Sequence, residues 1–187
     1  SSSFAPPAPA PPLDTNRSAA LCQLSINGSA LSSRYHPDYW GADACHDGDK
    51  EMGANPCWTS YEAGPYLRLY TAPSSLEYVR VYNRVDINQE YLGEYFVSYT
   101  TDADPTASSA NWTQCASNVA SATFGPFVSA CSASDVTGVQ VRKSTEEWGT
   151  LNLEEVELFG QCSLPPSPPP LLPPPPSSSP SSPPALP

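Results

Sequence analysis

The sequence is short of basic residues: 8 Lys and Arg stand against 19 Asp and Glu, so the formal net charge is −11 at pH 7. An acidic surface repels phosphate backbones, and no cluster of Lys and Arg offsets that repulsion, so nucleic acid is not an expected partner. Cations are the natural ligands of such a surface. Apolar runs of about 20 residues are also missing, which argues against membrane insertion.

Catalytic motifs are missing too. The chain contains no GxSxG elbow and no P-loop, and its two histidines, His36 and His46, have no evident partner in the sequence. The sequence does not open with a charged and then apolar leader, so we expect a mature form or a piece of a longer protein. These absences predict a protein that is not an enzyme.

Proline is scarce only in the middle of the chain. Of 24 prolines, 5 lie in residues 1–12 and 13 lie from Pro165 onward. The distribution predicts a Pro/Ser/Ala-rich linker over residues 1–20, one globular domain over residues 21–162, and a Ser/Pro-rich stalk in polyproline II conformation over residues 163–187. The stalk is either a ligand for a PxxP-binding domain or a glycosylated extracellular rod, and the second interpretation is favoured.

Cysteines and glycosylation sequons indicate the compartment. The six cysteines form an even set with no CxxC pair, and Asn-x-Ser/Thr sequons occur at Asn16, Asn27 and Asn111. Together with the flanks they favour a secreted, disulfide-bonded glycoprotein in an oxidising setting. The connectivity stays open, but a bond between Cys22 and Cys162 would close the domain where its flanking segments leave.

The domain has the alternating pattern of β-strands. Turn residues such as Ala72, Pro73 and Ser74 separate the alternating segments, and no segment holds a helical period. An antiparallel sandwich or barrel is expected, with a long loop from Arg34 to Tyr61. The predicted strands cover residues 66–71, 76–83, 92–100, 136–142 and 151–159.

Two polar segments are candidate sites. The stretch from Cys45 to Glu51, CHDGDKE, places two aspartates around a glycine, which offers hard oxygen ligands for calcium but also describes a solvated acidic turn. Arg84 and Asp86 end a strand near Tyr91. They could hold sugar hydroxyls beside an aromatic ring, or could form an exposed ion pair.

Three features in order resemble the second half of an F-type (fucolectin-like) lectin domain. They are YVRVYNRVD at residues 78–86, Cys115 with Cys131, and VQVRKSTEEWGTLNLEEVELFG at residues 139–160. That family belongs to the discoidin-like, galactose-binding jelly-roll class. The resemblance implies an all-β, eight-stranded antiparallel jelly-roll β-sandwich, in which Cys115–Cys131 matches the internal disulfide of the family.

The same resemblance implies one structural Ca²⁺ ion. Carried over to this sequence, the ligands are carboxylate oxygens of Asp47 and Glu155 and main-chain carbonyls of Ala44, Asp49 and Glu154. Glu154 stands where the family has a cysteine. Cys57 therefore needs another partner, and Cys45 is expected to fill that role.

The fucose site of the family carries over only in part. Arg84 matches the first arginine, but the second arginine falls near Tyr91 and the histidine near Thr59, and the adjacent cysteines of the family are absent. Losing these anchors should remove most fucose affinity, since each hydrogen bond to a charged group contributes about 1.5 to 3 kcal/mol. The fold is expected to remain while lectin activity is lost or changed.

The flanks resemble the hydroxyproline-rich glycoproteins of green-algal cell walls and flagellar surfaces. Our leading interpretation is an extracellular structural or adhesion module: a calcium-braced lectin-like domain on proline-rich rods in a wall, matrix or surface fibre. Its partners would be glycans, other matrix glycoproteins or copies of itself. The alternative is an active lectin that binds a glycan at Arg84, Asp86 and Tyr91, with Trp58 and Thr59 nearby.

The closing segment LNLEEVELFG changes the phase of its alternation at Glu154 and Glu155. If this segment lies beside the acidic stretch from Cys45 to Glu51, the change predicts a β-bulge that turns a carbonyl and a carboxylate toward one point. Glu155 is then the expected metal ligand, and Glu157 is expected to be solvated. Leu151, Leu153, Val156 and Leu158 should close the sheet.

Overall fold

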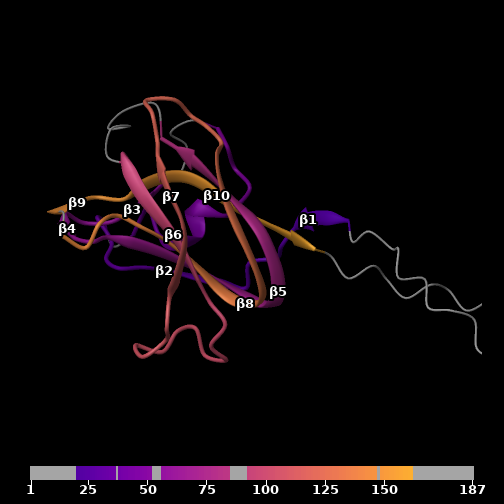
Figure 1. Cartoon of the computed structure of the whole chain (residues 1–187). Helices are drawn as coiled ribbons and strands as arrows, with labels where there is room; N and C mark the ends of the chain where they lie inside the picture. Colours follow the sequence, from indigo (N-terminus) through magenta and orange to yellow (C-terminus); the bar gives the residue numbers. More distant parts are fainter. Residues whose placement is uncertain (1–19, 37, 52–55, 85–91, 147, 162–187) are drawn as a thin grey trace, which may run out of the picture.

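The computed structural model describes residues 20–36, 38–51, 56–84, 92–146 and 148–161, so the predicted polyproline II flanks and Asn16 lie outside the described residues. Regular structure in the described part is β except for one 3-10 helix, η1 (Ala42–Cys45) (Figure 1). The strands are β1 (Leu21–Gln23), β2 (Gly28–Leu31), β3 (Cys57–Trp58), β4 (Glu62–Ala63), β5 (Tyr66–Asn83), β6 (Glu94–Thr100), β7 (Thr113–Val119), β8 (Phe127–Arg142), β9 (Trp148–Gly149) and β10 (Asn152–Gln161).

One sheet of eight strands forms the body of the domain. Its order is β1-β10-β5-β8-β6-β7, with β2 added to β5 and β3 added to β10, and every pair is antiparallel. A second sheet contains only β4 and β9. The antiparallel β architecture expected from the alternating segments is therefore confirmed.

The long strands β5 and β8 join two layers of the sandwich. Residues 67–70 of β5 pair with β2, whereas residues 75–83 pair with β10. β5 pairs with β8 from Tyr66 to Val81, with register shifts between Tyr70 and Tyr78, where both ribbons curve over in Figure 1. The expected turn at Ala72–Ser74 is therefore wrong. Thr71 and Ser74 form hydrogen bonds to the Ala72 carbonyl, which allows a bend without ending the strand.

The core fills the space between the layers with alternating aliphatic side chains. On β5, Leu67 and Leu69 are fully buried in the first half, as are Val79 and Val81 in the second. The four residues that were expected to close the sheet, Leu151, Leu153, Val156 and Leu158, are all fully buried too. Burial of each such side chain contributes about 1.5 to 3 kcal/mol.

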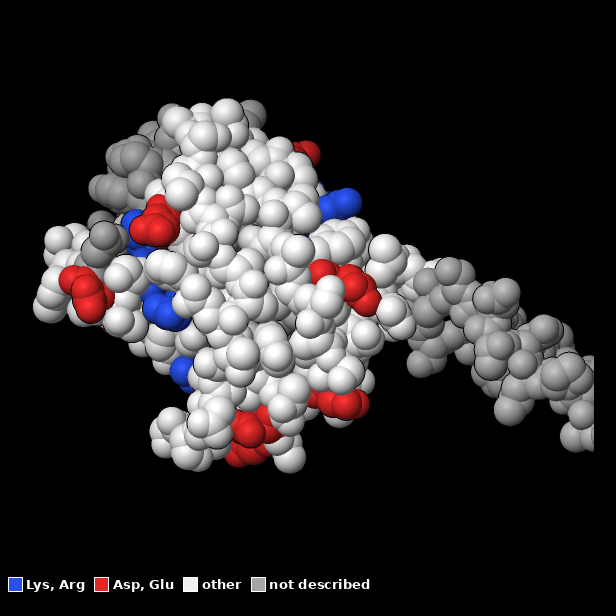
Figure 2. Space-filling model, in the orientation of Figure 1, with Lys and Arg blue, Asp and Glu red and all other residues white. Residues whose placement is uncertain are grey.

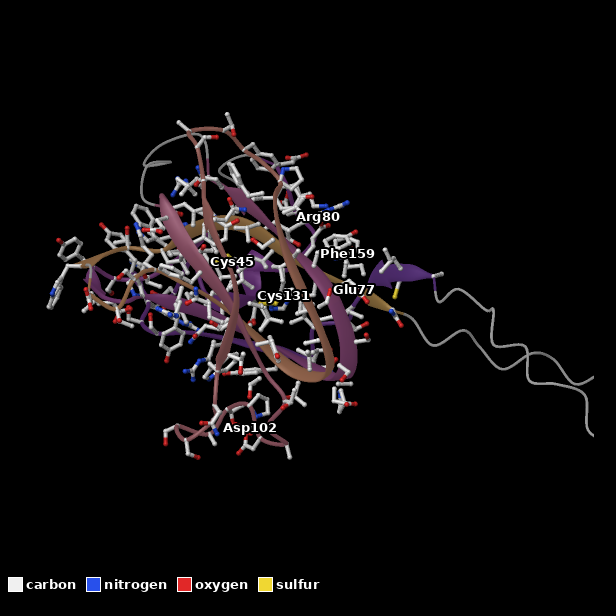
Figure 3. The ribbon with its side chains drawn as sticks, viewed as in Figure 1. Cys45, Glu77, Arg80, Asp102, Cys131 and Phe159 are labelled. Atoms are coloured by element: carbon white, nitrogen blue, oxygen red, sulfur yellow. A yellow bond between two sulfur atoms is a disulfide. The ribbon has the colours of Figure 1, made fainter. Side chains whose placement is uncertain are left out.

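Two disulfides connect parts of the domain that the sheet does not pair. Cys45–Cys57 ties η1 to β3, and Cys115–Cys131 ties β7 to β8. Both are among the pairs expected above, and Figure 3 shows Cys45 and Cys131 within the body of the domain. Cys22 is also disulfide-bonded. Its expected partner, Cys162, lies outside the described residues.

The first and last strands lie side by side. Leu21 pairs with Gln161 and Cys22 with Gly160, so the chain enters and leaves the domain at one end (Figure 1). Gly160 is required there, because a Cβ atom at this position would lie 1.7 Å from the Ser75 carbonyl oxygen. Among the described residues, no helix has the length and apolarity needed to cross a membrane.

Candidate functional site

The acidic loop, residues Cys45 to Glu51, lies against β10 where the pairing of that strand with β5 is irregular. The register of β10 against β5 shifts between Leu153 and Glu155, which confirms the predicted bulge. The Cys45 sulfur lies 3.5 Å from the Leu153 carbonyl oxygen, so the disulfide holds the loop beside the bulge. Glu154 and Glu155 are consecutive in the chain and are both buried.

Glu155 is a buried carboxylate next to a second one. Burial, and then the charge of Asp47, raise the pKa of Glu155 to about 8, although the Gly48 N–H hydrogen bond works in the opposite direction. Its Oε2 atom has no hydrogen-bond partner among the described residues. A cation stabilises a buried carboxylate that has one oxygen without a hydrogen-bond donor and a like charge nearby.

Asp47 and Asp49 hold the backbone of the acidic loop in place through local hydrogen bonds. The Asp47 carboxylate accepts the Asp49 N–H at 2.8 Å, the Asp49 carboxylate accepts the Glu51 N–H at 2.8 Å, and Gly48 takes a φ of +85°. These local hydrogen bonds form successive Asx turns, in which the remaining carboxylate oxygens stay available. The loop therefore keeps Asp47 in one orientation near Glu155.

The predicted ligand set fits a hard cation by its chemistry. In the described ranges, no three His, Cys, Asp or Glu side chains gather into a metal-binding group. A metal held by Asp47 and Glu155 would therefore need main-chain carbonyls, as predicted for Ala44, Asp49 and Glu154. Such an all-oxygen set suits Ca²⁺ rather than a transition metal.

Glu157 is buried, so the expectation that it is solvated is wrong. Its carboxylate accepts hydrogen bonds from the Lys50 ammonium at 2.5 Å and from the Tyr82 hydroxyl at 2.9 Å, with the Arg80 guanidinium 3.8 Å away. The Lys50 contact raises the pKa of that ammonium. Because Lys50 belongs to the acidic loop, this ion pair fixes the loop to β10 at a second point.

A cluster of rings lies on the other side of the Cys45–Cys57 disulfide. We call it the aromatic cluster; its members are Tyr35, His36, Tyr39, Trp40 and Trp58. The Trp58 ring stacks on Tyr35 with centroids 4.5 Å apart and 12° between planes, and Trp40 lies 5.4 Å from Trp58. His36 lies 5.1 Å from Tyr39. The guanidinium carbon of Arg84 is 5.4 Å from the Trp58 centroid.

Backbone hydrogen bonds hold the aromatic cluster in place. Trp58 belongs to β3, which pairs with β10. The Tyr35 N–H donates to the Trp58 carbonyl at 3.0 Å, and the Trp58 N–H donates to the Trp40 carbonyl at 3.1 Å. Trp40 has a φ of 58°, which is rare for a large side chain and is maintained here by its neighbours.

Only part of the aromatic cluster faces solvent. Tyr35 is 55% exposed and Tyr39 is 64% exposed, whereas Trp58 and Arg84 are buried beneath them. Tyr39, Tyr35 and His36 therefore form the accessible surface, and Trp58 with Arg84 supports it. Sequence reasoning singled out Trp58 and Arg84 but not the tyrosines, although the stretch RYHPDYW carries the aromatic signal.

The other predicted sugar-binding residues have different positions. Thr59 is fully buried, its hydroxyl accepts the Leu151 N–H at 2.8 Å, and its N–H donates to the Leu151 carbonyl. It supports the sheet, so the prediction that it contacts a ligand is wrong. Asp86 and Tyr91 lie outside the described residues.

Within the described ranges, His46 takes part in an arrangement that suggests a catalytic group. Its Nε2 atom lies 2.9 Å from the Ser29 hydroxyl, which donates to Asp43 at 2.6 Å. In a nucleophile relay the carboxylate would bind the ring nitrogen opposite the hydroxyl, whereas Asp43 binds the hydroxyl itself and lies 3.7 Å from the same nitrogen. The arrangement is a surface hydrogen-bond cluster.

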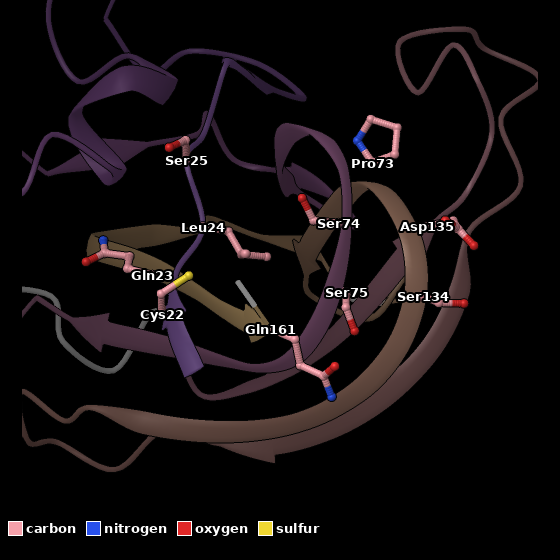
Figure 4. A pocket seen from close by; sticks show the side chains of 10 residues that line it. All are labelled: Cys22, Gln23, Leu24, Ser25, Pro73, Ser74, Ser75, Ser134, Asp135 and Gln161. Atoms are coloured by element: carbon pink, nitrogen blue, oxygen red, sulfur yellow. The ribbon is translucent and has the colours of Figure 1, made fainter. Parts of the chain in front are cut away.

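An open hollow of about 490 Å³ lies at the end of the domain where the flanking segments attach (Figure 4). None of its lining side chains has a buried polar atom without a partner. None of the residues that line the hollow is buried, so it lacks the enclosed polar groups that mark a ligand site. Its lining residues are Cys22, Gln23, Leu24, Ser25, Pro73, Ser74, Ser75, Ser134, Asp135 and Gln161.

No protein-family model and no curated protein matches the chain in sequence. Solved structures do match its fold. A fucolectin from striped bass (Morone saxatilis) serum superposes with a TM-score of 0.60 at 19% identity, over 72% of this chain and 45% of that one. An F5/8 type C domain from Bacteroides fragilis superposes with a TM-score of 0.58 at 13% identity, over 72% of this chain and 91% of that one. The domain has the galactose-binding-like β-sandwich fold.

A third neighbour is chitosan-binding module 1 of a chitosanase/glucanase from Paenibacillus sp. IK-5, with a TM-score of 0.58 at 15% identity, over 74% of this chain and 99% of that one. The bacterial modules are thus matched almost end to end, whereas this chain spans less than half of the fucolectin chain. At such identities the likeness establishes the shared fold. The ligand depends on this chain's own residues.

Proposed function

We propose that the domain is an extracellular carbohydrate-binding module whose glycan site is the aromatic cluster with Arg84. The observation that carries the proposal is the stack of Tyr35 on Trp58, with the Arg84 guanidinium 5.4 Å from the same ring. Aromatic faces bind the C–H faces of sugars, and the buried guanidinium holds the Trp58 ring on which the exposed Tyr35 stacks. Tyr35 and Tyr39 provide the accessible rings.

The fold supports this proposal because neighbours with the same architecture are described as a fucolectin and a chitosan-binding module. Terminal fucose bound as in the F-type family is not proposed. Thr59, which falls near the position of the family's histidine, is buried and satisfied by Leu151. The fucose site of the family uses a histidine and two arginines, whereas the site proposed for this chain presents exposed tyrosines.

We further propose that Ca²⁺ braces the site from its other side. Asp47 and Glu155 would supply carboxylates, and Ala44, Asp49 and Glu154 would supply carbonyls. The support is the buried Glu155 oxygen without a partner beside the Asp47 charge. When bound, the ion would neutralise this pair and fix the loop that the Cys45–Cys57 disulfide joins to Trp58.

Location outside the cell is part of the proposal. The two disulfides favour an oxidising compartment, and the sequons at Asn27 and Asn111 are both exposed. The acidic composition fits this setting, and on the face drawn in Figure 2 the Lys and Arg side chains stand as separate spots. A structural role in a wall, matrix or surface fibre is the second candidate, favoured by the proline-rich flanks.

A glycan array, probed with the whole chain in calcium and again in EDTA, tests the proposal. We expect reproducible binding to a defined set of glycans in calcium, lost or much reduced in Tyr39→Ala and in Arg84→Lys. Val128→Ala, which alters an exposed aliphatic residue on β8, is the control and should bind as the native chain does. If the native chain binds no glycan while its melting curve shows it folded, the structural role replaces the proposed one.

A further inference from the structure

Exposed rings in the described part of the chain gather at one end of the domain. Four aromatic side chains there are more than half exposed: Tyr35, Tyr39, Tyr61 and Trp148. The other large apolar side chains with such exposure are aliphatic. Figure 1 places β3, β4 and β9 together at the end opposite β1. An exposed apolar surface of this kind marks a place where a ligand or partner is bound.

Tyr61 and Trp148 form a pair of their own, apart from the aromatic cluster. Their ring centroids are 6.0 Å apart with 32° between planes, and the side chains are 67% and 66% exposed. Trp148 starts β9 and pairs with Ala63 of β4, so a two-stranded sheet outside the main sheet holds the pair together. Neither ring belongs to the hydrophobic core.

The pair lies close to the aromatic cluster along two neighbouring segments. The Ser60 hydroxyl donates to the Arg34 carbonyl at 2.8 Å, and the Ser60 N–H donates to the Ser33 hydroxyl at 3.0 Å. The segment before Tyr35 therefore runs beside the one that leads from Trp58 to Tyr61. Tyr61 follows Trp58 by three residues, a span of up to roughly 10 Å, which is longer than one sugar ring.

The surface around the two ring systems is polar and carries charges of both signs, since Arg34 lies against Gly41 and Lys143 against Gly149. The Glu62 carboxylate accepts hydrogen bonds from the hydroxyls of Ser32 and, at 2.7 Å, of Ser33. Asp38 and Glu146 are exposed nearby in the chain, in a protein with a net charge of −11. Carboxylates accept hydrogen bonds from hydroxyl and ammonium groups and repel anions. With three carboxylates against two cations near the rings, this surface favours neutral or amino sugars over sulfated or uronic ones.

We propose that Tyr61 and Trp148 form a second stacking subsite, which extends the glycan site to successive sugars of a neutral or amino-sugar oligosaccharide chain. The inference rests on the proposed function, because the first sugar is bound at the aromatic cluster. A sugar chain that lies across both ring systems gains affinity with each ring it covers. A single terminal sugar leaves Tyr61 and Trp148 uncovered.

Calorimetric titration with oligosaccharides of increasing length tests the inference. The probes are β-1,4-linked oligomers of glucose, glucosamine and N-acetylglucosamine, from monosaccharide to hexasaccharide, and sulfated and uronic oligomers as anionic counterparts. We expect affinity in at least one neutral or amino-sugar series to rise by about tenfold or more with length, since each covered ring contributes on the order of a factor of ten. The anionic oligomers should bind more weakly at each length.

The double variant Tyr61→Ala with Trp148→Ala should keep the native affinity for the shortest ligand and lose the gain with length. Val119→Ala with Val128→Ala, two exposed aliphatic residues elsewhere, is the matched control and should keep the gain. A gain with length that survives the double variant, or a native chain that binds the monosaccharide and the hexasaccharide equally, overturns the subsite but leaves the proposed function standing. Absence of binding to every probe and to the glycan array overturns the proposed function itself.

Sedimentation of the native chain and the double variant separates a ligand site from a contact between copies. We expect both to sediment as the same species, because the pair is assigned to a sugar chain. Self-association that the double variant abolishes would overturn the subsite. Melting curves of both variants should match the native curve, since all four side chains are exposed.

Discussion

The guanidinium carbon of Arg84 lies 5.4 Å from the centroid of the Trp58 ring, at the point where strands β5 and β3 end on either edge of β10. Arg84 follows the last residue of β5, and Trp58 is the last residue of β3. The contact brings together two residues that lie far apart in the sequence. It therefore links the sheet to the exposed tyrosines that Trp58 supports.

Arg84→Lys keeps the charge but loses the planar fork of donors. We expect glycan affinity to fall by about tenfold or more, because a lysine ammonium cannot reproduce the fork geometry at a stacked position. The measurement is a titration with the best ligand from the array, together with a thermal melt. A melting temperature within a few degrees of the native value and an unchanged affinity would remove Arg84 from the site.

Asp47→Asn and Glu155→Gln test the calcium proposal. The native chain should be stabilised by added calcium by roughly 2.7 kcal/mol when the ion is at a hundred times its dissociation constant. Each variant should lose most of this response, because each removes a carboxylate ligand. The readout is the free energy of unfolding by denaturant, with calcium titrated against EDTA.

Asp49→Asn is the matched control for the metal. Asp49 is proposed to offer its carbonyl, while its side chain accepts the Glu51 N–H, a bond that asparagine can also accept. The calcium response should therefore persist in this variant. Loss of the response in Asp49→Asn but not in Asp47→Asn would show that the ligands have been assigned wrongly.

Gly160→Ala should destabilise the domain by at least about 2 kcal/mol, because a Cβ atom there would overlap the Ser75 carbonyl and force β10 away from β5. Gly28→Ala is the control. A Cβ atom at Gly28 would meet Tyr70 at an ordinary contact distance of 3.6 Å, so this change should be tolerated. Denaturant unfolding of both variants gives the comparison, and equal stabilities would contradict the close approach.

Alkaline pH should destabilise the domain through its buried tyrosines. Burial raises the pKa of Tyr95, and it does the same for Tyr70 and Tyr82. The folded state therefore favours the neutral phenol. That contribution is fully present below the unfolded pKa of about 10, and it is lost as the pH rises from there through the folded pKa.

Tyr95→Phe should weaken the fall in unfolding free energy between about pH 9 and pH 11, because it removes the fully buried phenol. Tyr61→Phe serves as the control, since it alters an exposed tyrosine. Urea titrations at several pH values give the slopes. A native chain whose stability stays level across this range would contradict the prediction.

Much of the sheet could be predicted because it obeys local rules. The alternation of Leu67, Leu69, Val79 and Val81 marks the strand that joins the two layers. The phase change before Val156 marks the bulge, since a one-residue insertion must reverse the faces. Sequence reasoning failed where strands lack apolar alternation. The strand β7, TQCASNV, is an edge strand with a mostly polar pattern, and the bend at Pro73 resembles a turn.

The site was harder to predict because its parts meet only in the folded chain. Glu157 was expected to be solvated, but Lys50 and Tyr82 reach it from the acidic loop and from β5. Tyr35 and Trp58 stack because backbone hydrogen bonds align their two segments. No local spacing encodes such contacts. The exposed tyrosines beside Trp58 are therefore a finding of the structure.

The pairing of Leu21 with Gln161 also determines how the domain would respond to mechanical tension. Pulling on both flanking segments would load the β1–β10 ladder at its open end, so its hydrogen bonds would break one after another rather than together. Cys22, at the second pair, is disulfide-bonded. A bond from Cys22 to Cys162 would carry the tension across the base of the domain. The aromatic end would then stay folded and able to hold its ligand while the chain is stretched.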